Sequence, residues 1–103
     1  MVNNQILVLV NSSFELSATE QNMMQLLEQK INDLIINNFN KLIYLLYRAD
    51  INEAKLYHLL AQHKKENASK IIAALFVQRQ IEKLEARAMY KMNNVPDSDE
   101  ERW

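Results

Sequence analysis

The chain has 103 residues, with no cysteine, no glycine and one proline, and its 12 basic and 13 acidic residues give a net charge of −1. A chain of this length is expected to fold as one domain with a modest core. The missing glycines argue against tight β-hairpins, the missing cysteines exclude disulfides and thiolate chemistry, and the balanced charge provides no general attraction for nucleic acid or anionic lipid. These features predict an all-α fold.

Residues 1–16 contain a run of β-prone aliphatic residues, Ile6 to Val10, between segments rich in asparagine and serine. The run is far shorter than the ~20 residues that span a membrane, and it lacks the basic start of a signal peptide. We therefore expect a cytoplasmic protein. The pattern predicts a lone strand. Such a strand would pair with a second copy of the chain, pack irregularly, stay disordered, or form a leader outside the domain.

The helical domain is predicted to cover residues 17–92. Ser17 and Glu20 have the spacing of a capping box, so we expect the first helix to begin there and to continue to about Tyr47. Asn37 and Asn38 are its weak point, because asparagine competes for backbone hydrogen bonds. One long helix is the favoured interpretation, and a break at these two residues is the alternative.

Two further helices are predicted from capping signals. Asp50 and Glu53 have capping-box spacing and precede a short helix that ends near His63. Asn67 is expected to cap a third helix that ends at Asn93, before an acidic tail at 93–103. The first half of this third helix is apolar on every side, which predicts burial. Its second half keeps one apolar stripe.

Short connections would place these three helices, long, short and long, in an up-down arrangement. The middle helix, about 20 Å long, is too short to cover outer helices of about 40–45 Å. Part of the apolar surface should therefore be exposed, and the simplest cover is a second copy, which predicts a homodimer. Tyr44, Tyr47 and Tyr57, beside Arg48, are interpreted as core residues whose hydroxyls reach the rim, and the alternative is an aromatic and arginine anchor of an interface. The interface candidates are Ile81, Leu84, Ala88, Met92, Tyr47 and Arg48.

A line of basic residues at four-residue spacing marks another side of the third helix. Of these residues, Arg79 has an acid within reach along the helix, at Glu82, and the others have none. The simpler interpretation is a solvated helix face. The functional one is an anionic partner, meaning an acidic protein, nucleic acid or the acidic tail of the chain itself, and the net charge argues against nucleic acid. The candidates are Arg79, Lys83, Arg87 and Lys91, with Lys64 and Lys65 before the helix.

No motif for catalysis, metal binding or a cofactor is present in the sequence. His58 and His63 are five residues apart, so they do not share a helix face as metal ligands at i, i+4 do. No nucleophile is paired with a base, and no glycine is available for a phosphate loop. We therefore expect a self-associating protein–protein interaction module without catalysis. The alternative is a nucleic-acid-binding module that uses the basic line.

Two segments resemble a family of small helical bacterial proteins that has no assigned function. They are Leu45 to Ile51 and Gln78 to Ile81, and the likeness covers roughly residues 30–92. It implies a helical fold and no particular activity. Leu46, Tyr47 and Arg48 also spell the tripeptide of the mitochondrial assembly factors that dock on acyl carrier protein. In those proteins the tripeptide lies near the start of the first helix, whereas here it closes one, so no role is carried over.

Overall fold

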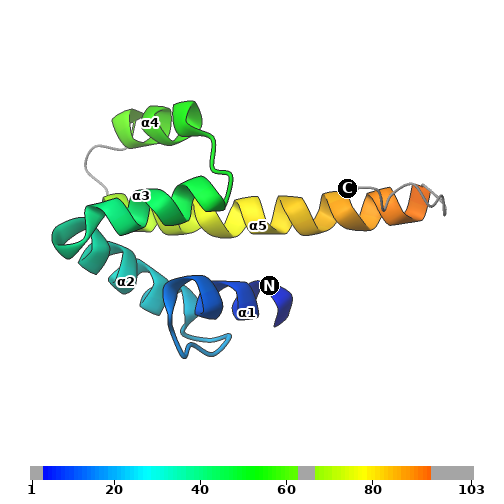
Figure 1. Ribbon diagram of the computed structural model, residues 1–103, viewed down its shortest axis with the longest axis horizontal. Coiled ribbons are helices and arrows are strands. Elements are labelled where there is room, and N and C mark those ends of the chain that lie inside the picture. Colours follow the sequence, from blue (N-terminus) through cyan, green and yellow to red (C-terminus); the bar gives the residue numbers. More distant parts are fainter. Residues whose placement is uncertain (1–3, 63–66, 94–103) are drawn as a thin grey trace.

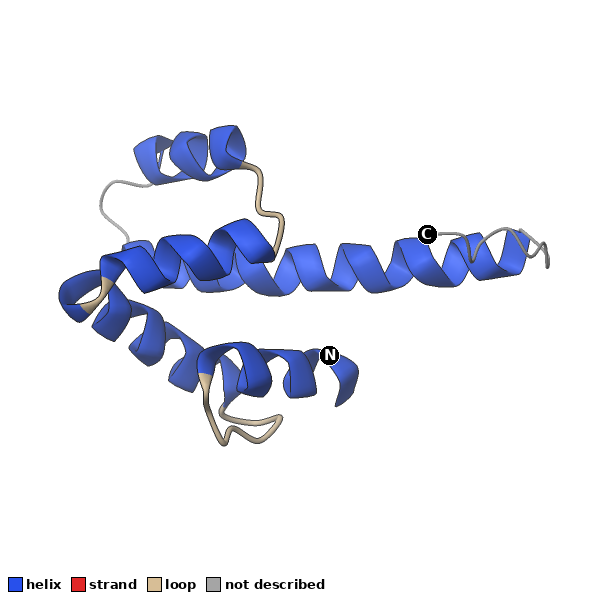
Figure 2. Cartoon of the chain, viewed as in Figure 1, coloured by secondary structure: helices blue, strands red, loops and turns tan. Residues whose placement is uncertain are grey.

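The computed structural model describes residues 4–62 and 67–93, with side chains up to residue 90. These residues form helices and no strand (Figures 1 and 2), which confirms the all-α prediction. Within this part of the chain, none of the helices has the length and apolar character needed to cross a membrane. The described residues form five helices instead of the three expected: α1 Asn4–Phe14, α2 Met23–Asn37, α3 Phe39–Arg48, α4 Glu53–Gln62 and α5 Ala68–Asn93.

The predicted strand near the N-terminus is wrong, because this segment forms α1. Ile6, Val10 and Phe14 follow the i, i+4, i+8 spacing of one helix face, and all three are buried. The Phe14 ring packs edge-to-face on Phe76 of α5, with centroids 5.0 Å apart. The aliphatic residues between them disguise this spacing in the sequence. Burial against α2 and α5 therefore outweighs the β propensity of the run.

The connection from α1 to α2 does not use the predicted Ser17–Glu20 capping box, which is wrong. Instead, the Thr19 backbone N–H donates to Asn22 Oδ1 at 2.7 Å, and α2 begins one residue later. The α1 helix ends with Glu15 at a φ of 58°, in the left-handed region where glycine is usual. A chain without glycine thus places a charged residue at this position.

Asn38 divides the predicted long first helix into α2 and α3, so the alternative of a break is correct and the single helix is wrong. The Asn38 backbone N–H still donates to Leu34 O at 2.9 Å, but φ is −156° and ψ is 67°. The Asn38 side chain then accepts a hydrogen bond from the Lys41 backbone N–H and caps α3. The break turns α3 away from the direction of α2 (Figure 1).

The predicted Asp50–Glu53 capping box is also wrong. Asn52 caps α4, and its side chain accepts from the Lys55 N–H at 2.9 Å. Asp50 lies at a φ of 65°, and the Ile51 N–H donates to Leu46 O at 3.2 Å, which is the hydrogen-bond pattern of a Schellman ending for α3. The Asp50 carboxylate is consequently free to contact α5.

The α5 helix has the two halves that its sequence predicts. Asn67 Oδ1 accepts from the Ser69 N–H at 3.0 Å, which confirms the predicted cap. The first half is buried and apolar, centred on Ile72 and Phe76. From Glu85 to Tyr90 every residue is exposed, and this end extends past the other helices (Figure 1). We call residues 85–93 the arm.

Candidate functional site

A groove of about 980 Å³ lies between α3, α4 and α5. It is mostly apolar, with a few charged residues at its rim, which is the usual character of a binding site. Its α3 wall includes Phe39, Ile43 and Tyr47, its α4 wall includes Leu56, Tyr57 and Leu60, and α5 contributes Ala68 and Ile72.

Phe39, Ile43 and Tyr47 form a line on α3 at i, i+4, i+8, which we call the α3 stripe. Their side chains are large and apolar, yet they are 54%, 47% and 82% exposed. The neighbouring face of α3 carries Leu42 and Leu46, which are buried against the rest of the molecule. The α3 helix therefore has one apolar face in the core and a second one directed to the groove and solvent.

The tyrosines near the end of α3 are not core residues, so that part of the sequence interpretation is wrong. Tyr44, Tyr47 and Tyr57 are all more than half exposed. The Arg48 guanidinium carbon lies 5.7 Å from the centroid of the Tyr44 ring, within the range of a cation–π contact. This contact holds an exposed cation at the rim of the groove, next to the α3 stripe. Within residues 4–62 and 67–90, Arg48 makes no ion pair.

The α4 wall of the groove is weakly packed. None of its residues, Glu53 to Gln62, is buried, and its apolar positions Leu56, Leu59 and Leu60 are half-buried. Its contacts are mainly with α5. Since apolar burial is the main stabilising contribution to folding, α4 is held less firmly than α1 or α2.

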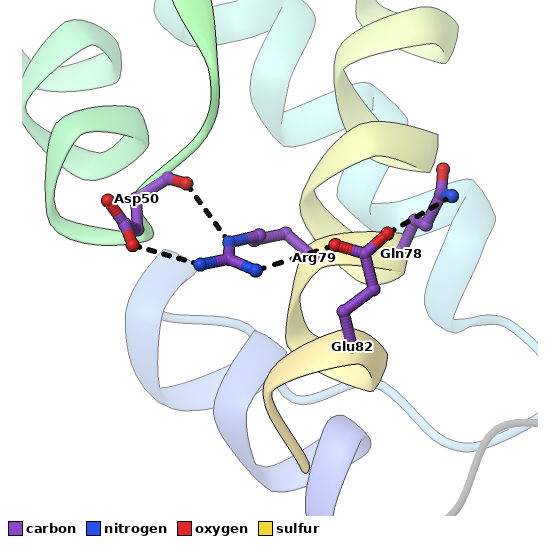
Figure 3. Close-up of polar contacts among 4 residues, drawn as sticks. All are labelled: Asp50, Gln78, Arg79 and Glu82. Atoms are coloured by element: carbon purple, nitrogen blue, oxygen red, sulfur yellow. Dashed lines mark hydrogen bonds and ion pairs between the residues drawn. The ribbon is translucent and has the colours of Figure 1, made fainter. Parts of the chain in front are cut away.

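One polar contact connects the α3–α4 loop to α5 (Figure 3). Arg79 Nη2 lies 2.9 Å from Asp50 Oδ2, and Arg79 Nε donates to Asp50 O at 3.1 Å. Arg79 Nη1 also lies 3.4 Å from Glu82 Oε1. The hydrogen bond from Arg79 to the Asp50 carboxylate raises the pKa of Arg79. We call this contact the Asp50–Arg79 clasp.

A second cavity of about 410 Å³ surrounds the clasp, with Lys55 and Gln78 in its lining. Gln78 Nε2 donates to Glu82 Oε2 at 3.4 Å, so several of its polar groups already bind one another (Figure 3). No group of three or more potential metal ligands occurs in the described part of the chain. His58 is exposed on α4, and His63 lies outside the described residues. This cavity is therefore best understood as part of the clasp.

The predicted basic line is divided by the structure. Arg79 is bound to two carboxylates, Lys83 is half-buried at the groove, and Arg87 is exposed on the arm. The side chain of Lys91 lies outside the described part of the structure, as do Lys64 and Lys65 in full. The described members therefore do not form one continuous surface of unpaired cations.

The predicted interface stripe of α5 is divided as well. Ile81 and Leu84 are half-buried and pack against the core of their own chain. Ala88 is exposed on the arm, and the side chain of Met92 is not described. The sequence pattern pointed to Tyr47 as an interface candidate but not to Phe39 or Ile43, so the α3 stripe was missed. Their spacing with Tyr47 was the available signal.

The groove and the α3 stripe thus combine an open apolar surface with a fixed arginine, an arrangement suited to binding another protein. Nothing in this geometry identifies a known relative. Comparisons with protein-family models, with curated proteins and with solved structures found no match to the chain.

Proposed function

We propose that the protein is a protein–protein association module that acts without catalysis and binds a second copy of itself through the groove. The observation that carries this proposal is the α3 stripe. Three large apolar side chains in helical register are exposed, although Leu42 and Leu46 already supply the core face of the same helix. Exposed apolar surface of this kind is typical of interaction sites.

The residues of this surface are of the types that dominate binding energy. Tyrosine and arginine are enriched at energetic centres of interfaces, and here Tyr47 and Arg48 are adjacent in the chain. Complete burial of an exposed apolar side chain contributes about 1.5–3 kcal/mol, so Phe39 and Ile43, which are about half exposed, would each contribute on the order of 1 kcal/mol, and Tyr47, 82% exposed, would contribute more. Together with the arginine at the rim, these contributions support a specific complex.

A second copy is the partner that best accounts for the rest of the surface. The α5 helix, 26 residues long, extends past the helices that cover its first half, and Met89 on the arm is 60% exposed. A homodimer with two-fold symmetry would cover equivalent surfaces on both chains at once. An unrelated partner in the groove would leave the arm exposed.

The nucleic-acid alternative has less support. Arg79 is neutralised by Asp50 and Glu82, and Lys83 is half-buried in the groove. Salt separates the two functions, because binding to phosphates weakens steeply between about 50 and 200 mM salt, whereas apolar association does not.

We expect Tyr47→Ser to weaken self-association about thirtyfold, the effect of losing roughly 2 kcal/mol at an interface centre. Sedimentation equilibrium at several concentrations would measure this, and circular dichroism would check that the helices remain. The matched control is Val8→Ser, which removes an exposed apolar side chain from α1, away from the groove. A mass of one chain at micromolar concentration for the unaltered protein would refute the proposal.

A further inference from the structure

We propose that the groove of each chain receives the α5 arm of a second copy, so that the two chains exchange arms around a two-fold axis. This inference rests on the self-association proposed above and specifies which segment fills the groove. It places Glu85 of the arm against Arg48 on the α3 wall, and Arg87 of the arm against Glu53 on the α4 wall.

The arm has the surface of a helix that packs closely in an apolar groove. It contains two small residues, Ala86 and Ala88, beside the exposed Met89. Small residues let a helix backbone approach its neighbours, and methionine adapts its shape to irregular apolar surroundings. Every residue from Glu85 to Tyr90 is exposed in the single chain. The described part of the arm, residues 85–90, therefore offers an exposed helical surface to a partner.

The arm is short enough to lie within the length of the groove. Along α5 the groove extends from Ala68 to Lys83, a distance of about 22 Å at 1.5 Å per residue. The nine residues of the arm span about 13 Å by the same measure. The α4 wall has no buried residue, so it can adjust its position to a helix between itself and α3 at little cost.

The charges of the arm and of the groove are complementary. Arg48 at the end of α3 and Glu53 at the start of α4 lie on opposite walls at the same end of the groove. Glu85 and Arg87 are two residues apart on a helix, about 200° around its axis, and thus point to opposite sides. Among the described residues, none of these four charges forms an ion pair. A helix between the walls can satisfy both pairs together.

Two-fold symmetry gives the arm the direction that this pairing requires. If the two α5 helices cross near Lys83 at a two-fold axis perpendicular to them, they run antiparallel. Each arm then enters the partner groove beside Arg48 and Glu53 and continues toward the Ala68 end. The exchange fills both grooves, covers both arms and closes the dimer.

The absence of cysteine from the chain allows a direct test with introduced cysteines. Chains with Met89→Cys in the arm are mixed with chains carrying Ile43→Cys in the groove, and mild oxidation is followed on non-reducing gels. In the control, chains with Gln29→Cys replace the chains with Ile43→Cys. We expect at least about tenfold more mixed disulfide dimer with Ile43→Cys than with this control, because docking raises the effective concentration of the two thiols. Gln29 is exposed on α2, outside the groove.

The mass of the unaltered protein, together with the crosslinking result, distinguishes self-association in general from the exchange of arms. A dimeric mass with arm–groove crosslinks supports both. A dimeric mass with crosslinking at the control level overturns the arm exchange and leaves self-association in place. A single-chain mass overturns both.

Charge reversal tests the assigned pairs without cysteines. Arg87→Glu should weaken the dimer about threefold to fivefold, the range of a partly exposed ion pair, and adding Glu53→Arg in the same chain should restore it. Failure of the second change to restore affinity would overturn the pairing of Arg87 with Glu53.

Discussion

The two sides of this molecule differ in how their apolar residues are used. On one side, α1, α2 and the first half of α5 bury Phe14, Leu27 and Phe76 almost completely. On the other side, α4 has no buried residue and α3 leaves Phe39, Ile43 and Tyr47 exposed around a groove. The first side provides most of the folding free energy, and the second keeps apolar surface available for contact.

Because of this difference, one set of helices provides the stability of the fold and another set provides the surface for binding. A region with few buried contacts opens locally at lower free energy than the core, and binding surfaces are commonly drawn from such regions. The Asp50–Arg79 clasp is a polar contact between the two sides, because it joins the α3–α4 loop to the middle of α5. It positions a wall of the groove without burying that wall.

The largest effect is expected in the core. Phe76→Ala should lower the free energy of unfolding by about 3–5 kcal/mol, since it leaves a cavity beside the Phe14 ring. Urea unfolding followed by circular dichroism would measure this loss. Phe39→Ala is the matched control, measured at a dilution at which the chains are single, because Phe39 is 54% exposed in the single chain and should then cost about 1 kcal/mol or less. Equal losses for the two phenylalanines would contradict the division into two sides.

A smaller effect is expected in α4. Leu60→Ala should cost about 1 kcal/mol or less, because the leucine is half-buried. Amide hydrogen exchange should show lower protection in α4 than in α2 already in the unaltered protein. If α4 and α2 exchanged at the same rate, α4 would belong to the cooperative core, and the division of the molecule into two sides would be wrong.

The smallest effect on overall stability is expected at the clasp. Arg79→Gln should speed amide exchange from Asp50 through α4 and leave the midpoint of urea unfolding nearly unchanged, because surface ion pairs contribute little to stability. Glu82→Gln is the control, since it removes the contact within α5 and keeps the bond to Asp50. Unchanged exchange in α4 for Arg79→Gln would show that the clasp does not hold this wall.

The pH dependence of Arg79 follows from its raised pKa. The Asp50 hydrogen bond favours the charged guanidinium in the folded state. Its stabilising effect is therefore complete below the ordinary pKa of arginine and is lost only as the pH rises through the raised value. The protonation of Arg79 should leave the clasp unaffected from neutral to moderately alkaline pH.

Apolar periodicity predicted the later helices, α4 and α5, well and the earlier ones poorly, whereas of the predicted caps the one at Asn67 is confirmed. Asn67 marks the start of α5 because its side-chain oxygen accepts a hydrogen bond from the backbone N–H of Ser69 in the first turn. At Asp50 the spacing predicted a cap for α4, but this residue instead takes the left-handed conformation that ends α3. At Ile6 to Val10 the aliphatic run satisfied both a strand and a helix, and packing on α2 and α5 decided between them.

The sequence by itself determined that the chain is helical, that the first half of α5 is buried, and that the second half of α5 extends beyond the neighbouring helices. These properties follow from composition, from apolar spacing and from helix length, which are local quantities. Only the tertiary structure decided that α1 joins the core, that Arg79 binds Asp50, and that Phe39, Ile43 and Tyr47 form an exposed stripe beside a groove. Each of these depends on which distant residues meet. Periodicity places a side chain on a helix face and does not say what that face meets.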